Sequence, residues 1–217
     1  NIRSVTEMNE KGDLLLLTTY TFEYEGQTYN AFANRILSTR PFQTELVVNV
    51  TDDLPDADPN DKVIDVDLDK AGLQVSLRAA VDAVNDGLTS KIEFDIPGDN
   101  IPVIILIQAL PPITQPVTID GTTQAAGQVE VRGGAFAGAG FHLQGGASEV
   151  RGMVLNGFNG PEAAAVRISG PGENVIKGNW LGTDASGNQV RKTQFGVLIE
   201  GSAGNTIGGE SASDRNI

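Results

Sequence analysis

The chain of 217 residues is long enough for one large domain or two small ones, and its 28 acidic and 15 basic residues give a net charge of −13. This balance argues against a surface that binds nucleic acid or anionic lipid, because both attract positive charge. The absence of cysteine excludes disulfides and thiolate metal sites, and the longest apolar runs are too short to span a bilayer, which needs about 20 residues.

The first part of the chain, residues 1–43, is expected to be a small antiparallel β element. The segment DLLLLTTYTFEY (13–24) is rich in leucine, β-branched and aromatic residues, and the turn EGQ (25–27) separates it from TYNAFANRIL (28–37). NEKGD (9–13) is expected to form an earlier turn. Two or three strands alone are marginally stable in water. The element is therefore either the end of a preceding domain or a piece that packs on the domain that follows.

Residues 44–75 are predicted to be a strand followed by an acidic linker. The strand is TELVVNV (44–50), and Pro55 and Pro59 exclude a regular helix or a central strand after it. The negative charge of the chain is concentrated here, since residues 45–100 hold 14 acidic and 4 basic residues.

The oxygen-bearing side chains of this linker predict a calcium site. Closely spaced carboxylate and amide oxygens suit a hard cation, although this spacing lacks the loop of an EF-hand and its closing glutamate. A solvated acidic loop is the alternative interpretation. The candidate ligands are Asp52, Asp53, Asp56, Asp58, Asn60 and Asp61. No other cofactor is expected.

Residues 76–116 are predicted to cap the domain that follows. In LRAAVDAVNDG (77–87), apolar residues recur at helical spacing, with Ser76 placed as the N-cap and Gly87 as the C-terminal stop. A solenoid needs such a cap because its first coil exposes an apolar cross-section. The first, irregular strands are expected at 92–96 and 103–108, and an extended connector at 110–116.

The segment 117–217 repeats a phrase of the form apolar, variable, apolar, variable, glycine. Successive copies start 24, 25 and 31 residues apart, and such periods are typical of solenoids. The alternation predicts a strand with one buried face, and the glycine predicts a bend. Three short strands with turns fit one period, so the sequence predicts an all-β parallel β-helix. The copies are VTIDG (117–121), FHLQG (141–145), VRISG (166–170) and VLIEG (197–201).

A second phrase follows each copy and is expected to place basic side chains outward in successive coils. It reads VRG (131–133), VRG (150–152), IKG (176–178) and IGG (207–209). A cationic stripe of this kind could bind an acidic polysaccharide, and a loop on a rigid scaffold could add specificity at 182–194. A ladder of solvated ion pairs is the alternative, since Glu130 and Glu149 stand two residues before the arginines. The candidate glycan-facing residues are Arg132, Arg151, Lys177, Asp184 and Asn188.

Two further features of the repeat concern its coils rather than a ligand. Asn174 and Asn205 stand at matching places, where stacked side chains are expected to satisfy backbone groups of the turns. The repeat does not finish, because SASDRNI (211–217) is similar to the lead-in to another coil. The open edge would favour pairing. Either the chain continues, or a partner, expected to be another protein chain or a polysaccharide, covers this edge.

From residue 46 onward, the order of motifs resembles that of bacterial secreted and surface proteins with a right-handed parallel β-helix of the pectate-lyase-like superfamily. Their helix follows a Cys-Ser-Leu-Arg-Glu-Ala-Ile-type segment. The chain has Val75 at the cysteine position and Ile64 as counterpart of an upstream cysteine, so an aliphatic contact would replace a disulfide. The motifs are LRAAVDAVN, IEFDIPG, LPPITQPVTIDGTTQ, NVIKGNWLGTDASGN and GNTIGG.

The resemblance implies a bacterial extracellular or cell-surface setting and an architecture, but no activity. Enzymes of this fold need clustered carboxylates on one face. By the alignment above, the outward column of Asp120 continues with Gln144, Ser169 and Glu200, and His142 neighbours Thr118 and Arg167. No catalytic residue is therefore predicted.

The expected function is a non-enzymatic structural or adhesive module of a larger protein. A carbohydrate-active enzyme of the pectate-lyase-like kind is one alternative. A calcium-dependent carbohydrate-binding module that uses the acidic linker is another.

Overall fold

The chain divides into two compact units, residues 1–43 and 44–217. In the first unit, β1 (Ile2–Met8), β2 (Leu14–Tyr24) and β3 (Gln27–Leu37) form an antiparallel sheet in that order. The turns expected at residues 9–13 and 25–26 lie outside the described residues. The computed structural model describes residues 2–8, 14–24, 27–37, 46–61, 63–133 and 138–217. None of the helices in these ranges is long and apolar enough to cross a membrane.

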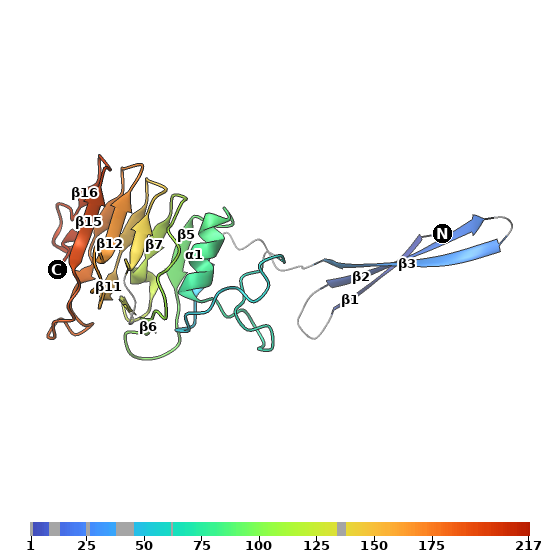
Figure 1. Ribbon diagram of the computed structural model, residues 1–217. Helices are drawn as coiled ribbons and strands as arrows, with labels where there is room; N and C mark the ends of the chain where they lie inside the picture. The colour runs from blue at the N-terminus through green and yellow to red at the C-terminus, as the bar shows by residue number, and fades with distance from the viewer. Residues whose placement is uncertain (1, 9–13, 25–26, 38–45, 62, 134–137) are drawn as a thin grey trace. The chain divides into compact units, whose positions relative to one another are not determined.

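The second unit is a parallel β-solenoid of about four turns, as the repeat predicts (Figure 1). Its coils stack into three sheets whose strands, in the described ranges, all run parallel. Sheet 1 contains β4 (Leu46–Val48), β5 (Lys91–Phe94), β7 (Thr118–Asp120), β10 (Glu149–Arg151), β13 (Val175–Lys177) and β16 (Thr206–Ile207). Sheet 2 contains β6 (Val103–Ile105), β8 (Val129–Arg132), β11 (Met153–Asn156) and β14 (Trp180–Leu181). Sheet 3 contains β9 (Phe141–Leu143), β12 (Ala164–Ser169) and β15 (Phe195–Glu200).

The register confirms three of the four repeated phrases as one column and corrects the fourth. In sheet 3, Val166 pairs with Phe141 on one side and with Val197 on the other. The phrase VTIDG (117–121) lies instead in sheet 1, where Ile119 pairs with the valine of the second phrase at 150–152. The alignment was wrong because strands of different sheets share the same alternation and are separated by similar numbers of residues.

The second phrase needs the same correction. Arg151 and Lys177 are neighbours in sheet 1, as expected. Arg132 lies in sheet 2, where it pairs with Asn156, so it does not belong to the same ladder. The expected cationic stripe is therefore divided between two sheets of the solenoid.

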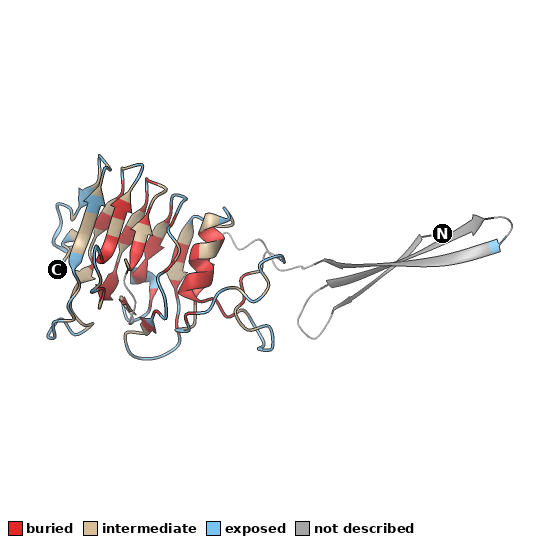
Figure 2. Ribbon diagram, in the orientation of Figure 1, coloured by how far each residue is buried: buried red, intermediate tan, exposed pale blue. Residues whose placement is uncertain are grey.

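Aliphatic and aromatic side chains from the three sheets fill the interior of the solenoid. The ribbon coloured by burial shows buried residues in α1 and along the stacked strands (Figure 2). Ile119, Val150 and Ile176, which follow one another in sheet 1, are fully buried, as are Leu143 and Ile168 in sheet 3. Each inward row thus stacks on the next at the strand spacing of about 4.8 Å.

The helix α1 (Leu77–Asn85) lies at the N-terminal end of the stack, beside β5 (Figure 1). The side chain of Ser76 accepts a hydrogen bond from the backbone N–H of Ala79, so it caps the helix as predicted. Gly87 follows the helix with φ of +72°, which glycine adopts without strain. The apolar stripe of α1 is buried, and so is Arg78, which the pattern did not predict.

Two columns of asparagine side chains run along the coils. The Oδ1 atom of Asn174 accepts from the N–H of Ser148 at 3.1 Å, and the Oδ1 atom of Asn205 accepts from the N–H of Asn174 at 3.1 Å. In a second column, Asn179 accepts from the N–H of Met153, and Asn216 accepts from the N–H of Asn179, both at 3.0 Å. The expected match of Asn174 and Asn205 is confirmed, and the second column is an addition to it.

Candidate functional site

The acidic linker does not gather its six candidate calcium ligands. Asp53 is buried, and its carboxylate accepts hydrogen bonds from Nε and Nη2 of Arg78 at 2.9 and 2.8 Å. The N–H of Ile107 donates to the same carboxylate at 2.7 Å, and Arg78 also donates to the carbonyls of residues 108 and 109. Asp53 therefore ties the linker to α1 and to the segment after β6. A buried, bidentate pair of this kind is a structural element.

Three other candidate acids, Asp56, Asp58 and Asp61, accept hydrogen bonds from backbone N–H groups of their own loop. The Oδ1 atom of Asp56 accepts from the N–H of Asp65 at 3.2 Å, and that of Asp58 accepts from the N–H of Asn60 at 3.1 Å. Burial raises the pKa of Asp56, and the backbone N–H groups that donate to its carboxylate offset only part of that rise. In the ranges that the structure describes, no three acidic or histidine side chains are placed to hold a metal ion. Asp52, Asn60 and Asp61 are exposed.

On the outer face of sheet 1, Asp120, Arg151 and Lys177 follow one another in successive coils, with Glu149 two residues before Arg151. Nη2 of Arg151 lies 2.5 Å from Asp120, and its Nη1 atom lies 3.4 Å from Glu149. Nζ of Lys177 lies 3.3 Å from the same glutamate. Burial would raise the pKa of Asp120, but hydrogen bonds from Arg151 and Thr122 outweigh it and lower that pKa below its usual value. Two of the candidate glycan-facing residues, Arg151 and Lys177, are thus engaged with acids of their own surface.

On the outer face of sheet 2, Glu130 lies buried beneath the loop at 182–194. Its Oε1 atom accepts from Arg132 at 2.8 Å and from Nδ2 of Asn156 at 3.0 Å, and its Oε2 atom accepts from the N–H of Ala185 at 3.3 Å. Nε of Arg191, from the same loop, lies 3.8 Å from the carboxylate. Desolvation is again outweighed by these hydrogen bonds, so the pKa of Glu130 is lowered.

Sequence reasoning missed this role of Glu130. Asn156 donates to the carbonyl of Thr183 at 2.7 Å, so the sheet and the loop are joined at two points. The candidate Arg132 is part of this cluster, whereas Asp184 and Asn188 are not. Asp184 accepts from the hydroxyl of Ser186 at 2.8 Å, and Asn188 is exposed at the loop tip.

On the outer face of sheet 3, the single histidine meets a serine. Nε2 of His142 lies 2.9 Å from Oγ of Ser169, and Arg167 pairs with His142 across the strands, as expected. The expected neighbour Thr118 lies in sheet 1. Burial and then the charge of Arg167 lower the pKa of His142, which favours the neutral imidazole.

The serine–histidine contact lacks the third group that an activated nucleophile needs. A general base must itself be oriented by another residue. In the described part of the chain, no carboxylate is hydrogen-bonded to the imidazole. Glu200, an acid on this face, accepts a hydrogen bond from Nε of Arg167 at 2.5 Å.

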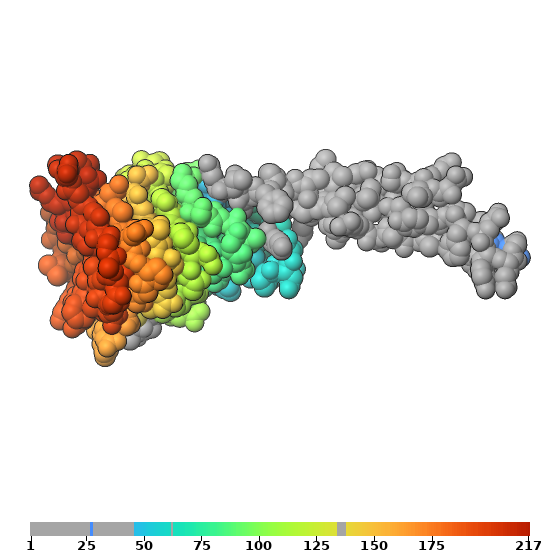
Figure 3. Space-filling view, turned by 90° about the horizontal axis from the view of Figure 1, so that it is seen from above, coloured from blue at the N-terminus to red at the C-terminus, as the bar shows by residue number. Residues whose placement is uncertain are grey.

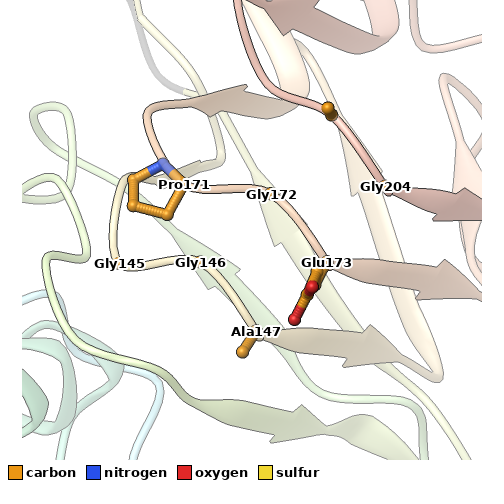
Figure 4. Close-up of a pocket in the computed structure, with 8 residues that line it drawn as sticks. Gly145, Gly146, Ala147, Pro171, Gly172, Glu173 and Gly204 are labelled. Atoms are coloured by element: carbon orange, nitrogen blue, oxygen red, sulfur yellow. The ribbon is translucent and has the colours of Figure 1, made fainter.

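A shallow groove follows the stacked turns between sheets 3 and 1 (Figure 4). It measures about 400 Å³ and is lined by small residues and one acid. Gly172 fits only because it has no Cβ, since a Cβ there would lie 1.5 Å from the carbonyl oxygen of Ala203. The groove therefore follows from close packing of the turns, and only Glu173 brings a charged group to it.

Comparison of the chain with models of protein families, with curated proteins and with solved structures gives no match. Among the described residues, charged side chains on the outer faces of the three sheets form ion pairs with one another.

Proposed function

We propose that the chain is a non-enzymatic structural or adhesive module of a bacterial surface or secreted protein. It would belong to the right-handed β-helix proteins of the pectate-lyase-like kind. The order of the motifs from residue 46 onward supports this assignment. Val75 and Ile64 stand where those proteins carry cysteines, and both side chains lie in the hydrophobic core.

The observation that carries the proposal is the pairing of the outward carboxylates. Hydrolysis or elimination on a glycan needs carboxylates that are free to exchange protons or to bind a cation. Here Asp120 and Glu149 are paired with Arg151, Glu130 with Arg132, and Glu200 with Arg167. Each of these acids has a basic neighbour, which is the arrangement of a neutralised surface.

A scaffold of this kind would be rigid along its length. The inward columns are continuous, and the asparagine columns fix each coil against the next. The described residues offer basic groups to an acidic glycan only in part, since Arg132, Arg151 and Lys177 are already engaged with carboxylates. Binding to a polysaccharide would therefore be weak and sensitive to salt.

The test is to incubate the protein with a panel of acidic and neutral polysaccharides, including polygalacturonate and alginate. Unsaturated products and new reducing ends are measured with and without Ca²⁺. The proposal expects no product from any of them. Product formation that Glu130→Gln or Asp120→Asn abolishes, while the circular dichroism spectrum stays unchanged, would assign an enzyme instead.

A further inference from the structure

A cleft of about 310 Å³ lies between the acidic linker and the helix α1. In the space-filling view, the linker, in cyan, lies against the green residues that follow it (Figure 3). Pockets that hold small ligands measure about 300–1,000 Å³, so the cleft has room for a small molecule. The described residues that line it lie between positions 55 and 88, outside the three sheets. The cleft is therefore separate from the outer faces on which the proposed function rests.

Most of the lining is apolar. Ile64 from the linker and Ala79 and Ala83 from α1 are buried, so they form the floor of the cleft. Two prolines of the linker are exposed at its rim. Such walls exclude water from an aliphatic chain and suit a ligand with a hydrocarbon stem. The apolar lining residues are Pro55, Pro59, Ile64, Ala79, Ala83 and Leu88.

The charge of the lining is entirely negative. It includes the half-buried Asp56 and Asp82 and the exposed Asp86, and no lysine or arginine is among the described residues that line the cleft. The nearby Arg78 is engaged with the buried Asp53. Burial raises the pKa of Asp82; the charge of Arg78 offsets part of this effect, whereas the charges of Asp86 and Asp56 add to it. A ligand that complements this lining must carry positive charge.

The spacing of the carboxylates indicates which kind of cation fits. In the described ranges, no three acidic side chains are placed to hold a metal ion, so a compact divalent metal does not match. Asp82 and Asp86, the C-cap residue of α1, are one helical turn apart on the same side of the helix. Four residues of helix span about 6 Å, which is about the distance between the two nitrogens of a diamine with four methylene groups.

We propose that this cleft binds a short linear aliphatic diamine. Its methylene chain would lie on the apolar floor formed by Ala79 and Ala83. One ammonium group would pair with Asp82, with Asp56 across the cleft, and the other would pair with Asp86 at the rim. A monoamine could satisfy only one of these two charged positions.

The experiment is a titration of the full chain, labelled with ¹⁵N, with putrescine, followed by the chemical shifts of the backbone amides. We expect saturable shifts at Ala79, Ala83 and Asp86. n-Butylammonium, which has the same number of carbons but one charge, should bind about fivefold more weakly, as the loss of one ion pair would give. Asp86→Asn should weaken putrescine binding to the level of n-butylammonium. The matched control is Asp99→Asn, which removes an exposed acid outside the cleft and should leave the affinity unchanged.

Four results would overturn the inference. No saturable shift below about 10 mM putrescine would remove the site. Equal affinity for putrescine and n-butylammonium would show that the second carboxylate does not select a diamine. An equal loss of affinity in both variants would show only a general attraction to the acidic surface. A peptide whose single cation is a lysine side chain, binding as tightly as putrescine, would assign the cleft to a partner protein.

The titration and the polysaccharide assay report on different parts of the protein. Product formation from a polysaccharide would refute the structural role and leave putrescine binding in place. Failure of putrescine to bind would remove the cleft as a site and leave the structural role in place.

Discussion

Replacement of Asn179 by alanine tests how strongly the asparagine columns hold the coils together. The side chain is fully buried. Its Oδ1 atom accepts from the N–H of Met153 at 3.0 Å, and its Nδ2 atom donates to the carbonyls of Val150 at 2.9 Å and Lys177 at 3.0 Å. Alanine leaves the buried N–H of Met153 without this partner and removes one hydrogen bond from each of the two carbonyls.

The expected cost follows from these lost hydrogen bonds. An unsatisfied buried N–H costs about 1–3 kcal/mol and each lost bond to a carbonyl about 0.5–1.5 kcal/mol, so we expect Asn179→Ala to lower the free energy of unfolding by about 2–6 kcal/mol. That is a large part of the roughly 5–15 kcal/mol of a typical domain. The matched control is Asn205→Ala at the open end, where water can replace the lost partners, and there we expect about 1 kcal/mol.

The assay is urea unfolding followed by far-ultraviolet circular dichroism, with the fluorescence of Trp180, the single tryptophan, as a second probe. Circular dichroism decides the comparison, because Trp180 adjoins the substituted residue. A cost for Asn179→Ala no larger than that for Asn205→Ala would refute the reasoning that the buried column holds the coils in register.

Four further changes test other parts of the structure. Gly172→Ala should prevent close stacking of two turns and strongly lower the stability of the protein in thermal unfolding. The control Gly201→Ala has open space around it and should cost only about 1 kcal/mol, from its positive φ. Equal costs for the two variants would contradict this. Arg78→Met leaves a buried carboxylate unpaired, so we expect a loss of about 3–5 kcal/mol in urea unfolding, and a loss under about 1 kcal/mol would contradict that role. The lowered pKa of Glu130 stabilises the folded protein; this contribution is complete above the ordinary pKa of 4.5 and is lost as the pH falls through the lower pKa of the folded state. Glu130→Gln should therefore remove this pH-dependent part of the unfolding free energy. An unchanged pH profile of stability would contradict this. Calorimetry with Ca²⁺ should give the same trace for the original protein and Asp58→Ala, because the linker acids do not converge, and a difference would restore the calcium site.

The periodic parts of the fold could be predicted from the sequence. Ser76 and Gly87 bound the helix α1 because capping and left-handed backbone geometry depend on residue type at single positions. The phrases at 141–145, 166–170 and 197–201 form one column, as their common alternation predicts. Local patterns of this kind need no knowledge of the partner strand.

The assignment of strands to sheets could not be derived in the same way. All three sheets use the same alternation, and the turns vary in length, so the spacing of the phrase at 117–121 matched a strand of the wrong sheet. That error also placed Arg132 in a ladder with Arg151.

The burial of Asp53 and Glu130 escaped prediction for a related reason. Both look like surface acids in the sequence. Asp53 finds Arg78 25 residues away, and Glu130, although it pairs with the nearby Arg132, is covered by Asn156 and by a loop that come at least 26 residues later. The only local signal was Arg78, a basic residue that interrupts the apolar face of α1.

The measurement that tests the account most directly is native-state hydrogen exchange along the two asparagine columns. The account predicts that the amides of Ser148, Met153 and Asn174 exchange among the slowest in the protein and lose protection together as denaturant is added. Rates at these amides as fast as those at the exposed loop position Asn188 would contradict the claim that the columns hold the coils in one register.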